Sequence, residues 1–178
     1  TIDRHFGDHI PFVTSDNYKA TYQAIEFLIK KNCQNIGYIG GKPRVESEVE
    51  YRLNAYKDVM KKYKREPIIS YEIFNHGEEM IYAGQFLKEH PSLDGIFASG
   101  DTMAYSLYQV AGQMGIKVPE QLKIIAYDGV LNDWFTSPSI TSCKQDIPKM
   151  AEAAVNQMKI RIKELPTERV TNIPTEFV

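Results

Sequence analysis

The sequence is poor in cysteine and has no long apolar run. Its 178 residues include two cysteines, Cys33 and Cys143, neither in a Cys-x-x-Cys pair nor at metal-ligand spacing from a histidine. A disulfide framework or a zinc site is therefore not expected, and two reduced thiols suit the cytoplasm. No stretch approaches the ~18 apolar residues of a membrane helix, so we expect no membrane partner. The chain begins at Thr1 rather than methionine, which leaves a processed or truncated product open.

The sequence also lacks an excess of positive charge. Lys and Arg total 21 against 23 Asp and Glu, a formal net charge of −2. Strong binding to a phosphate backbone needs many cations that displace counterions, so this chain alone is not expected to bind nucleic acid. Apolar residues make up 43% and charged residues 25%, which are values typical of a globular protein and exclude disorder.

Short apolar segments alternate with segments of helical periodicity through most of the chain. Strands are predicted at 10–14, 36–39, 68–74, 95–98 and 122–127, with helices at 21–32, 53–65, 78–89 and 103–114 between them. This alternation favours a parallel sheet with helices on both faces. Turn residues follow Tyr127, and then a short strand at 140–143, a helix at 147–162 and an edge strand at 171–178 that Pro174 interrupts.

No motif for covalent catalysis, a cofactor or a metal is present. Gly40-Gly41-Lys42 resembles a phosphate-binding loop only superficially, because Pro43 follows the lysine, and no Gly-x-Gly-x-x-Gly or Gly-x-Ser-x-Gly occurs. Among the histidines, His5 and His9 alone have helical metal-pair spacing, but Gly7 lies between them and opposes a helix. We therefore expect no cofactor, no metal and no catalytic residue.

A set of polar and aromatic residues follows the predicted strands or begins the next helices. Ligands bind at this edge of open α/β sheets. The candidates are Asp3, Asp16, Arg52, Phe74, Asp101 and Asp128. Each also has a structural explanation, as helix caps (Asp16, Asp101), a solvated charge (Arg52), a core ring (Phe74) or a turn residue (Asp128). Together, a guanidinium, several carboxylates and a ring suit a hydroxyl-rich ligand.

Longer motifs run through nearly the whole chain in a fixed order. They are Ile2-Asp3-Arg4, Val13-Thr14-Ser15-Asp16-Asn17, Ile36-Gly37-Tyr38-Ile39-Gly40-Gly41, Arg52-Leu53-Asn54-Ala55-Tyr56, residues 94–104, residues 115–120, Ile124-Ile125-Ala126-Tyr127-Asp128-Gly129 and residues 138–142. Through these motifs the sequence resembles the effector-binding core of the lactose repressor/galactose repressor family of bacterial transcription regulators.

The resemblance implies an α/β, periplasmic-binding-protein-like fold. One Rossmann-like lobe, a parallel sheet flanked by helices, is joined to part of a second lobe. The implied boundaries are residues 1–11 for the end of the N-terminal lobe and a crossover, 12–130 for the C-terminal effector-binding lobe, 139–164 for a return to the N-terminal lobe, and 165–178 for a crossover and the final strand. The family's DNA-binding headpiece is absent from this chain.

The resemblance also implies a ligand and a mechanism. The family's ligand contacts fall on Asp3, Arg52, Phe74, Asp101 and Asp128, with Asp16 as a further candidate. Gly100 stands where many sugar-binding members have asparagine and purine-binding members have glycine, so a sugar effector is favoured and a purine stays open. Closure of the lobes in a homodimer would then modulate binding of the headpieces to operator DNA.

Two other functions stay open at this point. One is a periplasmic sugar-binding protein of a transport system, which shares the two-lobed plan. The other is a small α/β enzyme that uses Asp101 or Asp128 as a base. No paired nucleophile supports the enzyme, and the motifs at 115–120 and 127–129 look more like those of the regulators.

Overall fold

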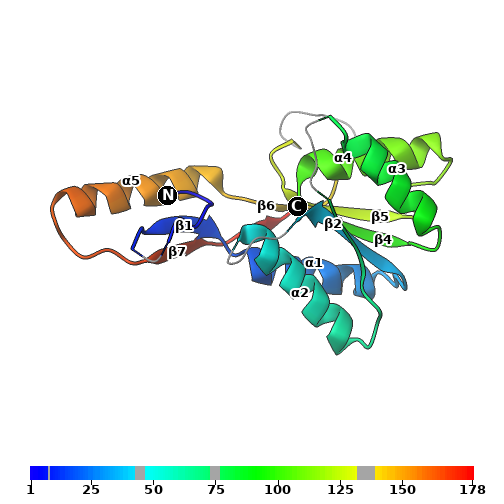
Figure 1. The fold of residues 1–178 in the computed structure, drawn as a ribbon, viewed down its shortest axis with the longest axis horizontal. Helices are drawn as coiled ribbons and strands as arrows, with labels where there is room; N and C mark the ends of the chain where they lie inside the picture. Colours follow the sequence, from blue (N-terminus) through cyan, green and yellow to red (C-terminus); the bar gives the residue numbers. More distant parts are fainter. Residues whose placement is uncertain (8, 43–46, 73–76, 132–138) are drawn as a thin grey trace.

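A large sheet and a small sheet make up the fold (Figure 1). The computed structural model describes residues 1–7, 9–42, 47–72, 77–131 and 139–178. The large sheet has the strand order β3-β2-β4-β5-β6-β8, in which β8 alone is antiparallel to its neighbour. Its strands are β2 (Ile36–Gly41), β3 (Ile68–Glu72), β4 (Gly95–Ala98), β5 (Lys123–Asp128), β6 (Ser142–Lys144) and β8 (Glu176–Phe177).

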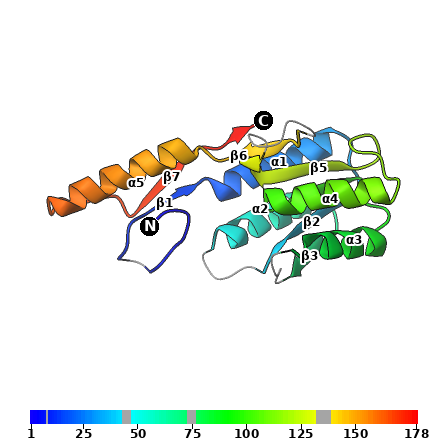
Figure 2. The same cartoon turned by 90° about the horizontal axis from the view of Figure 1, so that it is seen from above.

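Two pairs of helices cover the two faces of the large sheet (Figures 1 and 2). Helices α1 (Asn17–Lys30) and α2 (Glu48–Lys62) pack together on one face, and α3 (Glu79–Glu89) and α4 (Asp101–Gln113) pack together on the other. Successive side chains of a strand point to opposite faces. Accordingly, Ile96 of β4 joins the core under α3 and α4, whereas its neighbour Phe97 joins the core under α1 and α2. The predicted alternation of strands and helices is confirmed.

Side-chain caps fix where several helices begin. The Asp16 carboxylate accepts a hydrogen bond from the Lys19 N–H at the start of α1. Asp146 does the same for the Lys149 N–H at the start of α5 (Ile147–Ile162). Such caps satisfy backbone donors that the first turn of a helix leaves free. Both capping residues lie in segments that connect the two sheets: Asp16 between β1 and α1, and Asp146 between β6 and α5.

The small sheet consists of β1 (Phe12–Ser15) and β7 (Val170–Ile173), which pair in parallel. Ile2 forms an isolated parallel bridge to Val13 beside them, and α5 packs on this sheet. Among the described residues of α5, Met150 alone is buried, while Ile147, Val155 and Met158 are exposed. The small sheet therefore leaves most of the apolar surface of α5 uncovered.

Three connections join the sheets: from β1 to α1, from β6 to α5, and from β7 to β8. Sheet membership differs from the boundaries expected from the sequence at two places. Residues 12–15 pair with β7 rather than with the strands of the large sheet, and residues 142–144 belong to the large sheet although they fall in the segment 139–164. Pairing partners lie far away in the sequence, so no local pattern specifies them. None of the described helices is long and apolar enough to cross a membrane.

Candidate functional site

Asp3, Arg52 and Asp128 lie together where the large sheet faces the small one. Asp128 ends β5, Arg52 lies in the second turn of α2, and Asp3 lies beside β1. Burial raises the pKa of Asp3, the positive charge of Arg52 opposes this rise, and the charges of Glu48 and Asp128 reinforce it. The three predicted residues are thus close enough for their charges to act on one another. Three elements distant in the sequence supply them.

Arg52 is buried and held on three sides. Its Nε donates to the Asn17 side-chain oxygen at 2.7 Å, and Nη1 donates to the Ser99 carbonyl at 2.6 Å. The guanidinium carbon lies 3.8 Å from the centre of the Tyr127 ring, with 6% of the residue exposed. A guanidinium stacked on an aromatic face gains cation–π attraction, and its planar fork fixes the direction of the remaining donors. Arg52 therefore has one defined orientation.

A chain of side-chain hydrogen bonds joins Arg52 to Asp3. Asn17 accepts from Arg52 and donates through Nδ2 to the Thr14 hydroxyl at 3.2 Å. The Thr14 hydroxyl in turn donates to Asp3 Oδ1 at 3.3 Å. Because Asp3 and Thr14 belong to the small sheet region and Arg52 to α2, this chain crosses from one sheet to the other.

Asp128 is held by Gln145, which follows β6. The Gln145 side-chain nitrogen donates to Asp128 Oδ1 at 2.7 Å, and its backbone N–H donates to the Asp128 carbonyl at 2.9 Å. Asp128 has a φ of 93°, a left-handed backbone value that residues other than glycine rarely adopt. A Cβ placed on Gly100 would lie 3.6 Å from Asp128 Oδ2, so the glycine leaves that oxygen without a side chain against it.

Asp101, at the start of α4, binds the loop that follows β5. Its Oδ1 accepts from the Gly129 N–H at 3.1 Å and its Oδ2 from the Leu131 N–H at 2.9 Å. Burial raises the pKa of Asp101, and these backbone donors oppose the rise. Asp101 thus fixes the loop beside Asp128 with both of its oxygens. Whether it also contacts a ligand stays a prediction.

The two other predicted residues are not placed against this cluster. Asp16 caps α1 through the Lys19 N–H at 3.2 Å, the structural role weighed for it above. Phe74 lies outside the residues that the structure describes. Their predicted roles in ligand binding stay untested.

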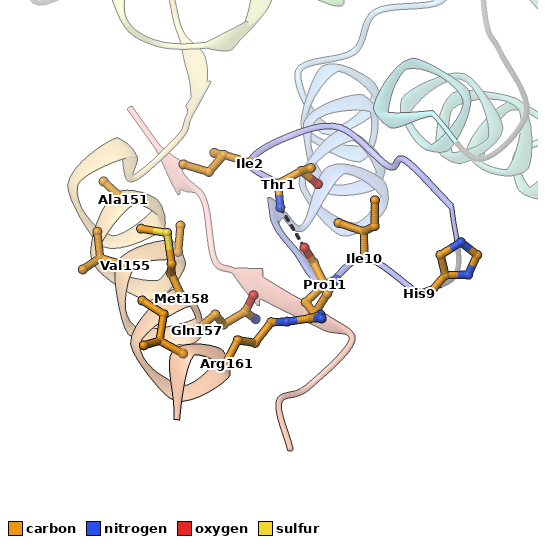
Figure 3. Close-up of a pocket in the computed structure, with 12 residues that line it drawn as sticks. Thr1, Ile2, His9, Ile10, Pro11, Ala151, Val155, Gln157, Met158 and Arg161 are labelled. Atoms are coloured by element: carbon orange, nitrogen blue, oxygen red, sulfur yellow. Dashed lines mark hydrogen bonds between the residues drawn. The ribbon is translucent and has the colours of Figure 1, made fainter. Parts of the chain in front are cut away.

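A cavity lies between α5 and the first eleven residues. It measures about 670 Å³, and apolar side chains line most of it, including Ile2, Ile10, Val155 and Met158, with Arg161 at its rim (Figure 3). The polar side chains of its lining are those of Thr1, His9, Gln157 and Arg161, and none of the clustered residues Asp3, Arg52 and Asp128 lines it. Within the described ranges, no group of three or more His, Cys, Asp or Glu side chains could hold a metal ion.

Sequence reasoning missed several residues of the site. Asn17 adjoins Asp16 and Tyr127 adjoins Asp128, so both lay inside motifs that were already recognised. Gln145 carried no such signal, because its partner Ser15 is 130 residues away in the sequence. The cluster offers a fixed guanidinium, which is stacked on the face of an aromatic ring, and two carboxylates near it. Such a set donates to and accepts from hydroxyl groups.

Comparison with known proteins agrees with the fold. Residues 25–178 match the model of the periplasmic binding protein-like domain. The ribose operon repressor of Halalkalibacterium halodurans is 30% identical over 178 residues, which cover 99% of this chain and 54% of that protein. The sucrose operon repressor of Streptococcus mutans is 31% identical over 177 residues, 97% of this chain and 53% of that protein. The chain spans about half the length of these relatives, whose names are those of repressors and not of enzymes.

Solved structures share the fold. A protein described as a periplasmic binding protein/LacI transcriptional regulator from Alkaliphilus metalliredigens, complexed with D-xylulofuranose, superposes with a TM-score of 0.87 at 22% identity, covering 99% of this chain and 67% of that one. The transcriptional regulator CelR in complex with cellobiose gives 0.87 at 24% identity, covering 99% and 56%. This chain belongs to the periplasmic binding protein-like domain family, and its sequence is similar to about half of the ribose and sucrose operon repressors.

Proposed function

We propose that this chain binds a sugar or a closely related polyhydroxyl effector between its two sheets. The observation that carries the proposal is the convergence of Arg52, Asp3 and Asp128 around Tyr127. Carboxylates accept from sugar hydroxyls, the arginine donates in a fixed plane, and charge-assisted hydrogen bonds are the strong ones. Binding is non-covalent, so the proposal needs no catalytic residue and no cofactor.

The names of the relatives favour a sugar over a purine. The ribose and sucrose operon repressors are named for sugars, while a relative from Klebsiella pneumoniae, the repressor PurR, is 28% identical over 159 residues. Gly100 keeps the purine alternative open, because purine-binding members of the family that the sequence resembles have glycine at this position. A purine is therefore the second candidate ligand.

The mechanism that we propose is a shift between open and closed arrangements of the two sheets. A ligand that contacts Asp3 on one side and Arg52 and Asp128 on the other favours the closed arrangement. To reverse an equilibrium from 1:99 to 99:1, it must bind the closed form ~10⁴-fold more tightly than the open form. Residues on both sides of the site are consequently the ones that matter for the response.

For the longer protein we propose a cytoplasmic homodimeric transcriptional regulator. Operator DNA would be bound through a headpiece outside this chain, in line with the 54% of the ribose operon repressor that the chain covers and with its own net charge of −2. The relatives' names favour this over a transport protein. Contacts of a dimer with DNA would then change with the angle between the sheets.

The test is a thermal-shift screen followed by calorimetry with D-ribose, sucrose, cellobiose, hypoxanthine and guanine. We expect a sugar to raise the melting temperature in proportion to its occupancy. The Arg52→Lys and Asp128→Asn variants should lose that shift, because neither replacement reproduces the fork or the charged acceptor. Each loss should exceed ~10-fold in affinity, since hydrogen bonds to charged groups contribute more than neutral ones.

Arg65→Lys is the matched control. Arg65 follows α2 at its opposite end and donates to the Cys33 carbonyl, away from the cluster. This variant should bind the same ligand as the wild type. Equal ligand affinity in the Arg52→Lys, Asp128→Asn and wild-type chains would contradict the proposed site, and a response to purines alone would replace the sugar.

A further inference from the structure

A second chain of buried side chains runs from β1 to Asp128 through Gln145. The Ser15 hydroxyl donates to Gln145 Oε1 at 2.7 Å, and Gln145 Nε2 donates to Asp128 Oδ1 at 2.7 Å. Ser15 is 1% exposed and Gln145 is 6% exposed. Met150 of α5 completes the contact, with its sulfur 3.4 Å from the Ser15 hydroxyl. The chain is thus sealed from solvent at its middle.

The chemistry of these groups permits one direction only. An ionised carboxylate accepts hydrogen bonds and donates none, so the Gln145 amide must turn its nitrogen toward Asp128. The amide oxygen then faces Ser15, which must act as the donor. Turning the amide over would set its oxygen against the carboxylate and leave buried polar groups unpaired, which costs more than a hydrogen bond contributes.

The position of this chain in the fold links it to the connections between the sheets. Ser15 is the last residue of β1, directly before the connection to α1. Gln145 lies in the connection from β6 to α5. The hydrogen bond between Ser15 and Gln145 therefore joins two of the three connections between the sheets. Together these two residues orient the Asp128 carboxylate, which lies on the large sheet.

Asp128 depends on this support for its conformation. Its φ of 93° carries a conformational cost that the surrounding structure must hold in place. Gln145 supplies two hydrogen bonds to it, one to the carboxylate and one to the carbonyl. Because Oδ1 accepts from Gln145, we expect a ligand to contact the other carboxylate oxygen, Oδ2.

We propose that Gln145 is a positioning residue, which orients the Asp128 carboxylate for the ligand under the control of Ser15. The inference rests on the proposed function for the identity of the ligand, but not for the orientation of Asp128. When the β1 and β6 connections shift against each other, the Ser15 hydrogen bond breaks and Asp128 loses its fixed orientation. Gln145 thereby couples the angle between the sheets to the affinity for the ligand.

The experiment compares Ser15→Ala, Gln145→Met, Gln145→Glu and the wild-type chain by nuclear magnetic resonance. The readouts are the carboxyl carbon shift of Asp128 and the hydrogen exchange rate of the Gln145 side-chain amide. Ser15→Ala should change both, although Ser15 does not contact Asp128, and should speed the amide exchange ~10-fold or more as the buried bond opens. Gln145→Met should shift the Asp128 signal further. Gln145→Glu, which places a second carboxylate against that of Asp128, should shift it most.

Gln157→Met is the matched control. Gln157 also donates through Nε2, to the Thr171 hydroxyl at 2.6 Å, but it lies on α5 within the small sheet region. It should leave the Asp128 signal where it is in the wild type. A Ser15→Ala chain that matches the wild type in both readouts would overturn the proposal, whatever the ligand. So would a Gln157→Met chain that moves Asp128 as far as Gln145→Met does.

Titration with D-ribose separates this proposal from the one before it. Gln145→Met should weaken D-ribose binding ~10-fold, the equivalent of one hydrogen bond to a charged group, while Gln157→Met does not. If D-ribose gives no heat with the wild-type chain, that result counts against ribose as the effector, and the Asp128 resonance still decides the role of Gln145. Unchanged D-ribose affinity in Gln145→Met, beside tight wild-type binding, would overturn the positioning role.

Discussion

The carboxylates of this chain differ in the interactions that shift their pKa values. Burial raises the pKa of Asp3, which the charge of Arg52 only partly offsets. Hydrogen bonds from the Lys149 side chain and backbone N–H lower the pKa of Asp146, and they outweigh the desolvation that opposes them. A raised carboxyl pKa in the folded state means that folding favours the protonated group, and a lowered one means the reverse. The ionised form of the Asp3 carboxylate is therefore maintained at a cost in stability.

The two carboxylates should give stability profiles of opposite sign. The pKa of Asp3 is higher in the folded state than in the unfolded state. The contribution of Asp3 to the free energy of unfolding therefore falls as the pH rises from the unfolded pKa through the folded pKa. Asp3→Asn should therefore gain stability relative to the wild type between about pH 3 and about pH 7. For Asp146 the folded pKa lies below the unfolded one, so Asp146→Asn should lose stability relative to the wild type over the same range.

Urea denaturation across that pH range measures both differences, because each variant removes one titrating group. Parallel curves for wild type and Asp3→Asn would contradict burial as the dominant influence on Asp3. Asp146→Asn is the control for the sign of the effect. Its free energy of unfolding should fall relative to the wild type as pH rises, whereas that of Asp3→Asn should increase.

At the scale of elements, the first residue of a connection also decides where a helix starts. Asp16 follows β1 and caps α1, and its backbone N–H donates to the Ile173 carbonyl at the end of β7. The same residue thus ends the small sheet and begins the first helix of the large one. Its local sequence, an acidic residue before a helical period, is typical of an N-cap.

Asp16→Ala should reduce the free energy of unfolding by about 1 kcal/mol, because it leaves the Lys19 N–H without its side-chain acceptor. Asp16→Asn keeps an acceptor in place and should stay close to the wild type. Chemical denaturation of the three chains checks the effect on α1, and D-ribose titration of Asp16→Asn checks the ligand role predicted from the sequence. Full D-ribose affinity in Asp16→Asn would leave the cap as the role of Asp16, and a large loss would restore the ligand contact.

The whole molecule is unevenly packed. Helix α4 buries six residues, among them Met103, Leu107 and Val110, against the large sheet. Helix α5 is longer but buries Met150 alone among its described residues, and the 670 Å³ cavity lies beside it. Stability follows buried apolar contact, so the small sheet region should open locally while the large sheet stays folded.

Hydrogen exchange of the 178-residue chain should show this difference directly. Amides of α5 should exchange ~10-fold or more faster than those of α4, a gap of about 1.4 kcal/mol in opening free energy. The α1 helix serves as the internal reference, because it is similar in length to α4 and buries six residues as well. Equal protection of α5 and α4 would contradict the uneven packing.

The sequence by itself determined the elements and much of the site. Apolar runs and helical periods are local signals, and they placed most strands and helices within a few residues of their positions in the structure. The single edge strand predicted at 171–178 was wrong, because this segment forms two strands, β7 and β8, in different sheets. The motifs around Asp3, Arg52 and Asp128 identified the three residues that converge. The sequence allowed either a cap or a ligand contact for Asp16 and Asp101. The structure shows that Asp16 caps α1 and that Asp101 accepts hydrogen bonds from the loop that follows β5.

Only the tertiary structure decided which sheet each end strand joins and which side chains hold the site. The pairing of β1 with β7 and the bond between Ser15 and Gln145 join residues more than a hundred positions apart. No local period encodes such partners, because they are chosen by the packing of the whole chain. The orientation of Asp128 depends on those distant contacts. For that reason the role of Gln145 could be recognised only from the tertiary structure.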